Sequence, residues 1–230
     1  MIKDSTLEEN YMKKIGVILC GCGYKDGSEI HESVGVLWAL SQYSGKISSI
    51  QCFAADDMQA DVVNCLIGQP VAAERRNMLV ESARIARGNV LPLSQMKPSE
   101  YDGLIIPGGF GAAKNLCTFA YKGSGGSVRK DLADILITMH KQGKPLGAIC
   151  IAPAILALAF KGKSFELTVG AKSEASAEIE KLGHKHIVCK VNEAHFDRKN
   201  NIASTPAYMY DGAPSNEIFE GIRKLVGYII

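Results

Sequence analysis

The sequence predicts an α/β protein in which helices cover both faces of a mostly parallel sheet. Short apolar runs alternate along the chain with segments of helical periodicity, which is the pattern of such a sheet. Residues 144–160 pass directly from a buried strand into a helix, with Cys150 at the junction. Since 230 residues suffice for one sizeable domain, we predict a polar N-terminal arm over residues 1–13 and a single domain over residues 14–230.

The first elements of this domain surround a glycine-rich loop. Residues 15–20 are continuously apolar and predict the first strand, and residues 21–27 predict the loop after it. Asp26 and Glu29 have the spacing of a capping box, with Asp26 as the helix cap. In the helix that follows, we expect the apolar face to pack on the core. The residues of that face are Ile30, Val34, Leu37, Trp38 and Leu40.

The remaining elements are predicted from the same two periodicities. Strands are expected near residues 47–54, 104–106, 167–169, 187–191 and 202–204, and in the run before Cys150. Helices are expected at residues 74–87, 131–142, 174–182 and 216–229. The glycine- and serine-rich segment 122–127 is the most flexible stretch, either as a plain surface loop or as a lid over a site.

The composition disfavours several kinds of partner. The 26 basic and 24 acidic side chains nearly cancel and form no basic stripe, so we expect neither nucleic acid nor a membrane as partner. No apolar run approaches the ~18 residues that span a bilayer. The N-terminus has no apolar core of a secretory signal, and its acidic residues argue against a transit peptide. The 7 scattered cysteines are therefore expected to be reduced thiols in the cytoplasm.

Nucleotide and metal sites find little support in the motifs. Gly21-Cys-Gly23 follows the first strand, but Asp26 stands where a dinucleotide-binding fingerprint has its third glycine, and its charge would oppose a pyrophosphate. The pair Cys20 and Cys22 lacks a second pair at zinc-finger spacing. His184, His186 and Cys189 match no ligand spacing rule either. We therefore expect no metal and no cofactor.

Cys150 is the candidate nucleophile. A sharp strand-to-helix turn lifts its side chain out of the carboxyl edge of the sheet, and the N–H groups of the helix start favour negative charge there. We expect this position to lower the pKa of the thiol, because the thiolate is the reactive form. The alternative is that Cys150 is only a small buried residue.

Two further segments are expected at the same edge of the sheet. The turn Pro107-Gly-Gly-Phe-Gly111 follows a strand and leaves N–H groups that can hold an oxyanion, unless it is only a glycine-rich turn. Glu32 lies in the first turn of the first helix, where it either complements the helix dipole or faces the thiol. In the second case burial and like charge would raise the pKa of Glu32, which could then relay a proton.

Together these segments resemble a known family. The strand-one loop, the Pro-Gly-Gly turn and the Ala-Ile-Cys elbow, in that order, resemble the class I glutamine amidotransferase-like superfamily and its PfpI-type branch. Five longer motifs are similar to those of the ElbB-type glyoxalase-like proteins, and the likeness covers about residues 14–229. The motifs are Gly21-Cys-Gly23, Asp26-Gly-Ser-Glu-Ile-His-Glu32, Pro107-Gly-Gly-Phe-Gly-Ala-Ala-Lys-Asn-Leu-Cys117, Ile149-Cys-Ile-Ala-Pro153 and Thr205-Pro-Ala-Tyr-Met209.

The resemblance implies a flavodoxin-like three-layer sandwich and assigns roles to four site residues. Cys150 matches the nucleophile and Glu32 its carboxyl partner. The backbone N–H groups of Gly109 and Ile151 match the oxyanion donors. Substrate binding is expected of His31, Gly108 and Asn115, with Glu32 facing Cys150 and His31 lining the rim.

One residue of the family pattern is missing. Much of the branch has a histidine after the strand that follows the elbow helix, and this chain has Gly170 there. His31, His184, His186 and His195 are the candidate substitutes. The late His-x-Glu of true glutaminases is also absent from the sequence, which argues against glutamine hydrolysis.

The resemblance therefore predicts an enzyme that works without a cofactor. It would convert a small dicarbonyl such as glyoxal to a hydroxy acid through a thioester on Cys150. The alternative is a non-enzymatic redox sensor or binding scaffold whose Cys150 oxidises. In either case we expect a cytoplasmic homodimer.

Overall fold

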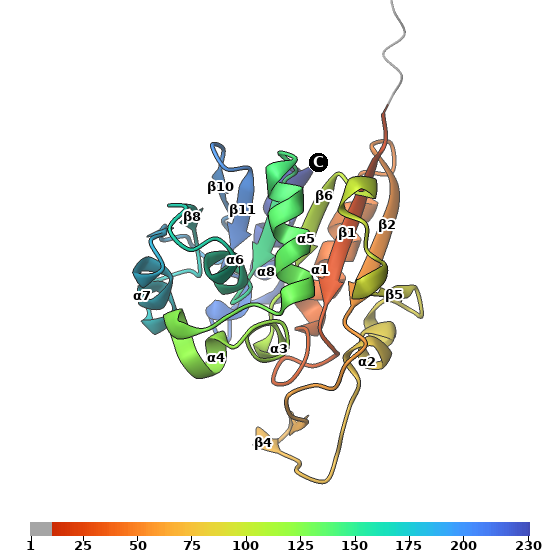
Figure 1. The fold of residues 1–230 in the computed structure, drawn as a ribbon, viewed down its shortest axis with the longest axis vertical. Coiled ribbons are helices and arrows are strands. Elements are labelled where there is room, and N and C mark those ends of the chain that lie inside the picture. The colour runs from red at the N-terminus through yellow and green to blue at the C-terminus, as the bar shows by residue number, and fades with distance from the viewer. Residues whose placement is uncertain (1–10) are drawn as a thin grey trace, which may run out of the picture.

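The computed structural model describes residues 11–230 and is built on a seven-stranded sheet (Figure 1). The strand order is β10-β11-β7-β6-β1-β2-β5, and every neighbouring pair is parallel except β10 with β11. The predicted α/β class is thus confirmed. The strands are β1 (Lys13–Leu19), β2 (Ile47–Ala54), β5 (Val90–Pro92), β6 (Gly103–Ile106), β7 (Leu146–Ile149), β10 (His195–Asp197) and β11 (Ile202–Thr205).

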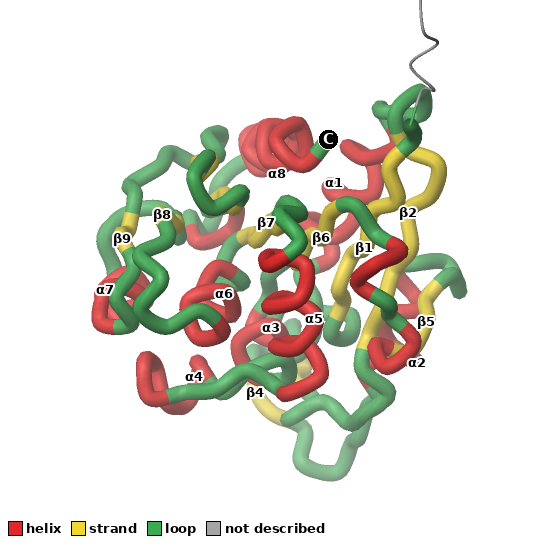
Figure 2. The backbone as a smooth tube through the Cα atoms, turned by 45° about the horizontal axis from the view of Figure 1, so that its top comes forward, coloured by secondary structure: helices red, strands yellow, loops and turns green. Residues whose placement is uncertain are grey.

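Helices cover both faces of this sheet, as Figure 2 shows. On one face α1 (Ile30–Ser41) and α8 (Ser215–Ile229) pack against each other, and α2 (Met78–Ile85) lies beside them against β2 and β5. On the other face α5 (Lys130–Lys141) and α6 (Pro153–Ala159) pack together. Each helix layer closes a separate apolar core against the sheet, which is the three-layer arrangement of this fold.

Short elements complete the chain. Three more helices are α3 (Phe110–Lys114), α4 (Phe119–Lys122) and α7 (Glu174–Lys181), and single 3-10 turns lie at Leu93–Gln95, Pro98–Glu100, Gly123–Gly125 and Ala207–Met209. Two small sheets lie outside the main one: the hairpin β3 (Val63–Asn64) with β4 (Gln69–Pro70), and the parallel pair β8 (Glu166–Leu167) with β9 (Lys185–His186). Within residues 11–230 the structure contains no helix long and apolar enough to cross a bilayer.

Helix α1 differs most from its prediction. Its expected core face is largely exposed, with 42% of Ile30, 46% of Val34 and 48% of Trp38 accessible to solvent. Of the predicted face only Leu40 is buried, and it shares the buried side with Glu32, Ser33, Gly35, Val36 and Ala39. Gly35 allows α8 to approach closely, because a Cβ atom there would lie 3.1 Å from Ile222. Tertiary packing thus overrides the apolar periodicity.

The start of α1 is also corrected. The cap is Glu29, whose carboxylate accepts a hydrogen bond from the Glu32 N–H at 2.6 Å, so the cap lies three residues after the predicted one and the helix begins at Ile30. Asp26 is not a helix cap. Its Oδ2 accepts a hydrogen bond from the Val63 N–H at 2.8 Å and ties the loop after β1 to the crossover after β2.

Other boundaries move for local reasons. The helix predicted over 74–87 begins only at Met78, because the Asn77 side chain caps it by accepting from the Val80 N–H. No strand covers residues 187–191, since β9 ends at His186. Segment 122–127 is fastened to α7, where the Ser124 N–H donates to Glu178 at 2.6 Å. Of the predicted arm, residues 1–10 lie outside the described part of the chain, and β1 already starts at Lys13.

The strand order explains where a site can form. Strands β7, β6 and β1 are neighbours, and their carboxyl ends meet at one edge of the sheet. The segments that leave this edge are the Cys150 elbow, the Pro-Gly-Gly turn and the loop that leads into α1. Strand β11, on the other side of β7, adds the Ala207–Met209 turn.

Candidate active site

Cys150 lies in a sharp elbow between β7 and α6. Its backbone has φ +61°, a left-handed conformation that costs a non-glycine residue about 1–3 kcal/mol. The Cys150 N–H compensates by donating to the Thr205 carbonyl at 2.9 Å, and Pro153 occupies the first turn of α6. The elbow turns the thiol into the site, where the side chain is almost fully buried.

Glu32 is the partner of this thiol. Its side chain is completely buried, and its carboxyl group hydrogen-bonds the Cys150 thiol. Its Oε2 accepts from the Gly108 N–H at 2.9 Å and its Oε1 accepts from the Tyr208 N–H at 3.3 Å. Burial, with a smaller contribution from the Glu29 carboxylate, raises the pKa of Glu32 to about 8. The carboxyl group is therefore mostly protonated at neutral pH.

The thiol does not have the lowered pKa that the sequence suggests. Burial and the neighbouring Glu32 carboxylate raise the pKa of Cys150 well above its ordinary value, although the N–H groups of Gly109 and Ile151 hydrogen-bond the sulfur and oppose the rise. The expected lowering is wrong because burial outweighs these donors. A single negative charge can form when the pair loses one proton, whereas a second loss would place two charges in one buried site.

The Pro-Gly-Gly turn leaves room for this pair to meet. A Cβ atom on Gly108 would lie 2.4 Å from the Cβ atom of Cys150 and 2.8 Å from Glu32 Oε2. Gly109 has φ +93°, and a Cβ atom on it would lie 2.5 Å from the Glu29 nitrogen. Only glycine fits at both positions. The Gly108 N–H is taken by Glu32, so its structural role is to hold the carboxyl group; substrate binding by Gly108 stays a prediction.

His31 and Tyr208 form the outer rim of the site, next to the buried Glu32. His31 is exposed, and its Nδ1 lies 2.8 Å from the Tyr208 hydroxyl. Tyr208 also gives its N–H to Glu32, so the 206–210 turn joins the buried carboxyl group to the rim. The sequence motifs include Tyr208 but indicate no role for it. Its place directly after β11, at the carboxyl edge of the sheet, was the signal that could have found it.

Asn115 is placed differently from its prediction. Its Nδ2 donates to the carbonyls of Cys20 at 3.0 Å and Asp26 at 2.8 Å, and its Oδ1 accepts from the Ala60 N–H at 2.9 Å. These bonds fasten the loops after β1 and β2 to α3. The structure gives Asn115 this fastening role and no free amide N–H for a substrate.

The ring of Tyr210 occupies the space beside Gly170, the position at which much of the family has a histidine. Gly170 has φ +91°, and a Cβ atom there would lie 3.0 Å from the ring of Tyr210, whose hydroxyl donates to the Cys189 carbonyl at 2.7 Å. A histidine therefore does not fit at this position in the present arrangement.

The three other histidines that could replace the missing one lie in the C-terminal half, around β8. His184 Nδ1 accepts from the Phe165 N–H at 3.1 Å, and His186 Nε2 accepts from the Val169 N–H at 3.3 Å. His195 Nε2 lies 2.8 Å from Glu166. All three hold the region around β8. Among the candidates, only His31 comes near the Cys150 and Glu32 pair.

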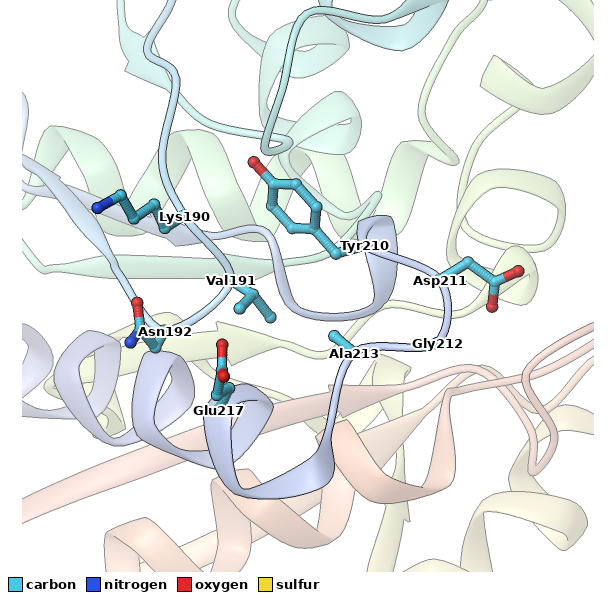
Figure 3. A pocket seen from close by; sticks show the side chains of 8 residues that line it. All are labelled: Lys190, Val191, Asn192, Tyr210, Asp211, Gly212, Ala213 and Glu217. Atoms are coloured by element: carbon cyan, nitrogen blue, oxygen red, sulfur yellow. The ribbon is translucent and has the colours of Figure 1, made fainter.

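A hollow of about 480 Å³ lies next to Tyr210 and does not include Cys150 or Glu32 in its lining (Figure 3). It opens between the 190–192 segment, the 210–213 turn and the start of α8. In Figure 3 the side chains of Lys190 and Asp211 point away from its centre. The hollow is open to solvent and lacks a convergent set of reactive groups. We therefore base the chemistry on the Cys150 elbow.

Comparison with known proteins agrees with this geometry. The profile of the DJ-1/PfpI family matches residues 45–190. A curated human relative, "Glutamine amidotransferase-like class 1 domain-containing protein 3, mitochondrial", is 41% identical over 94% of this chain and 82% of its own length. The "ES1 protein homolog, mitochondrial" of Rattus norvegicus is 39% identical over 94% of this chain and 83% of its own length. The names of these relatives place them in mitochondria, so a cytoplasmic location stays a prediction.

A solved structure extends the likeness to the whole fold. The "isoprenoid biosynthesis protein with amidotransferase-like domain" from Ehrlichia chaffeensis superposes with a TM-score of 0.86 at 33% identity, over 94% of this chain and 97% of its own. Drosophila melanogaster DJ-1beta, at 17% identity, shares the fold with a TM-score of 0.54, over 94% of each chain.

Proposed function

Since the chain belongs to the DJ-1/PfpI family, we propose that it is a cofactor-independent, glyoxalase-like enzyme of the ElbB type. It converts glyoxal or a similar small dicarbonyl, together with one water, to a hydroxy acid. One observation carries this proposal: the fully buried carboxyl group of Glu32 is hydrogen-bonded to the thiol of Cys150 in the elbow. Burial raises the pKa of this carboxyl group to about 8. A buried acid of this kind can both give and take a proton at neutral pH.

The reaction begins from the singly ionised pair. The Cys150 thiolate adds to one aldehyde carbon of glyoxal, and the oxygen that becomes negative lies against the N–H groups of Gly109 and Ile151. Glu32 gives this oxygen its proton, which completes a hemithioacetal. The same N–H groups that hydrogen-bond the sulfur in the free protein thus serve the new oxyanion.

Glu32, now a carboxylate, then moves a proton between the two carbons. It removes the hydrogen of the thiolated carbon and returns a proton to the neighbouring carbon, while the hydroxyl proton passes from the first oxygen to the second. The product is a thioester of glycolate on Cys150. Water hydrolyses the thioester, releases glycolate and restores the thiol, so no oxidant is needed.

The experiment follows carbon-13 glyoxal by NMR with the wild type, Cys150→Ala and Glu32→Gln. We expect glycolate from the wild type and only background from Cys150→Ala. Because an amide cannot relay a proton, Glu32→Gln should lose most of the turnover. Glycolate formation by Cys150→Ala at the wild-type rate would refute the proposal.

A second candidate function is redox sensing, and the filled Gly170 position favours it. With Tyr210 in the place of the family's histidine, Glu32 is the one acid–base group in hydrogen-bond contact with the sulfur among residues 11–230. The N–H groups that would hold an oxyanion would equally stabilise the oxygens of a sulfinic acid. Mass spectrometry after mild peroxide, beside glyoxal turnover by the same preparation, separates the two functions.

A further inference from the structure

The loop after β1 places a lysine beside the start of α3. The Phe110 N–H donates to the Tyr24 carbonyl at 2.8 Å, and the Gly111 N–H donates to the Gly27 carbonyl at 3.0 Å. This part of the loop therefore lies along the start of α3, directly after Gly109, whose N–H reaches the Cys150 sulfur. Tyr24 is thus hydrogen-bonded to the residue that follows Gly109, and Lys25 is the next residue along the loop.

Two aromatic rings hold the ammonium group of Lys25 there. Its Nζ lies 5.1 Å from the centre of the Tyr24 ring and 5.5 Å from the centre of the Phe110 ring. Both distances are in the range of cation–π attraction. Both rings are about half exposed, at 44% for Tyr24 and 50% for Phe110. The charge is thus positioned and still open to water.

The charges around Phe110 do not cancel. A second ammonium group, that of Lys114, lies 5.8 Å from the same ring, but it is paired with Asp61 at 2.8 Å. Lys25 has no carboxylate within salt-bridge distance in the described part of the chain. One positive charge beside Phe110 is therefore uncompensated.

The nearby acids are engaged elsewhere. Asp26 is buried and accepts from the Val63 N–H, with its pKa raised by burial. Glu29 caps α1, and burial raises its pKa too. Glu32 is turned inward to Cys150. None of the three offsets the charge of Lys25 at the surface.

We propose that Lys25 forms an anion subsite at the rim and that the substrate is a small aldehyde or dicarbonyl carrying a carboxylate. The identity of the reacting carbonyl rests on the proposed function, whereas the attraction of an anion to Cys150 does not. A single uncompensated charge matches a carboxylate monoanion better than a phosphate dianion. The rings of Tyr24 and Phe110 hold the ammonium group in place, so the subsite is formed before the substrate arrives.

The test compares two alkylating reagents that differ in charge. Iodoacetate and iodoacetamide both alkylate a thiolate, and peptide mass spectrometry gives the rate at Cys150 for each. The ratio of the two rates cancels any change in the thiol pKa or in access. In water, a unit charge ~6 Å from the carboxylate of the reagent changes such a ratio by about threefold. We expect Lys25→Gln to lower the iodoacetate-to-iodoacetamide ratio by about threefold and Lys25→Glu by about tenfold.

The chain offers a matched control in Lys46. This lysine also lies over a ring, 5.9 Å from the centre of Tyr43, but it precedes β2 at the opposite edge of the sheet. Lys46→Gln should leave the ratio unchanged. An equal ratio in wild type and Lys25→Gln, or an equal fall in Lys46→Gln, would overturn the proposal. Because neither reagent is a dicarbonyl, a failure of the glyoxalase reaction would leave this result intact.

Salt provides an independent readout. At ~1 M salt the screening length falls to ~3 Å, so the wild-type ratio should approach that of Lys25→Gln while the iodoacetamide rate stays the same. A wild-type ratio that does not respond to salt would contradict an electrostatic subsite.

Discussion

Replacing Gly108 by alanine tests whether the Pro-Gly-Gly turn makes the contact between Glu32 and Cys150 possible. The new Cβ atom would lie 2.4 Å from the Cβ atom of Cys150, 2.8 Å from Glu32 Oε2 and 2.8 Å from the Ile149 carbonyl oxygen. Ordinary contacts between such atoms are ~3.5 Å or longer. At least one of the two site residues must therefore move, and the backbone of β7 prevents the methyl group from escaping toward the strand.

We expect Gly108→Ala to lose both stability and glyoxal turnover. Overpacking of this kind costs about 1–3 kcal/mol of the free energy of unfolding, and in a chain of this size each kcal/mol lowers the Tm by ~2–4 °C. Because a displacement of ~1 Å in a reacting group can cost ~100-fold in rate, we expect glyoxal turnover to fall by about that factor while the protein still folds.

Gly45→Ala is the matched control, because nothing lies within 4 Å of a Cβ atom at Gly45. Calorimetry gives the Tm of both variants, and NMR of carbon-13 glyoxal gives their turnover. If Gly108→Ala melts and turns over like Gly45→Ala, the tight packing of Gly108 against both site residues is not what the chemistry depends on.

Four further outcomes are expected. Glu32→Gln should keep the pKa of the thiol within about one unit of wild type, as measured by thiolate absorbance. Folding raises the pKa of Glu32 from 4.5 to about 8, so the stability that its proton contributes is complete below pH 4.5 and is lost as the pH rises toward 8. The Tm of Glu32→Gln relative to that of wild type should therefore increase between pH 5 and pH 8. A constant Tm difference would contradict the raised pKa. His31→Ala should raise KM more than it lowers kcat, because His31 lies on the rim with Tyr208 and outside the buried pair; a loss as complete as that of Cys150→Ala would make His31 the base. We also propose a homodimer that covers the exposed apolar face of α1, so Trp38→Glu, at a side chain that is 48% exposed, should shift sedimentation toward the monomer.

Local sequence signals predicted the elements that lie at the centre of the sheet. The runs that became β1, β2, β6, β7 and β11 are short and apolar, and they were placed within a few residues of their true ends. The hairpin β3–β4 has two residues in each strand, which is too few for any periodicity to show. In the equally short pair β8–β9, β8 overlaps the strand expected near residues 167–169, whereas β9 ends just before the strand expected at 187–191. Strand β10 is similarly hidden, because His195–Asp197 is half polar and pairs at the edge of the sheet.

The sequence motifs predicted which residues lie together at the site, but they did not predict the pKa of Cys150. The order of the Gly-rich loop, the Pro-Gly-Gly turn and the elbow brought Cys150, Glu32, Gly109 and Ile151 together, as the motifs indicate. The pKa of Cys150 depends on how deeply the elbow is buried and on which way Glu32 turns, and neither is a property of neighbours in the sequence.

Helix α1 shows why periodicity fails where a functional side chain must be buried. A helix that turned Ile30, Val34 and Trp38 to the sheet would turn Glu32 toward solvent, because Glu32 lies on another face of the helix. The structure does the reverse: it buries the carboxyl group, gives it the N–H groups of Gly108 and Tyr208, and leaves the apolar residues exposed. Burying an acid without such partners costs several kcal/mol, so the glycine turn and the 206–210 turn are what allow this orientation. The exposed apolar face and the raised pKa of Glu32 are therefore two consequences of one rotation of the helix.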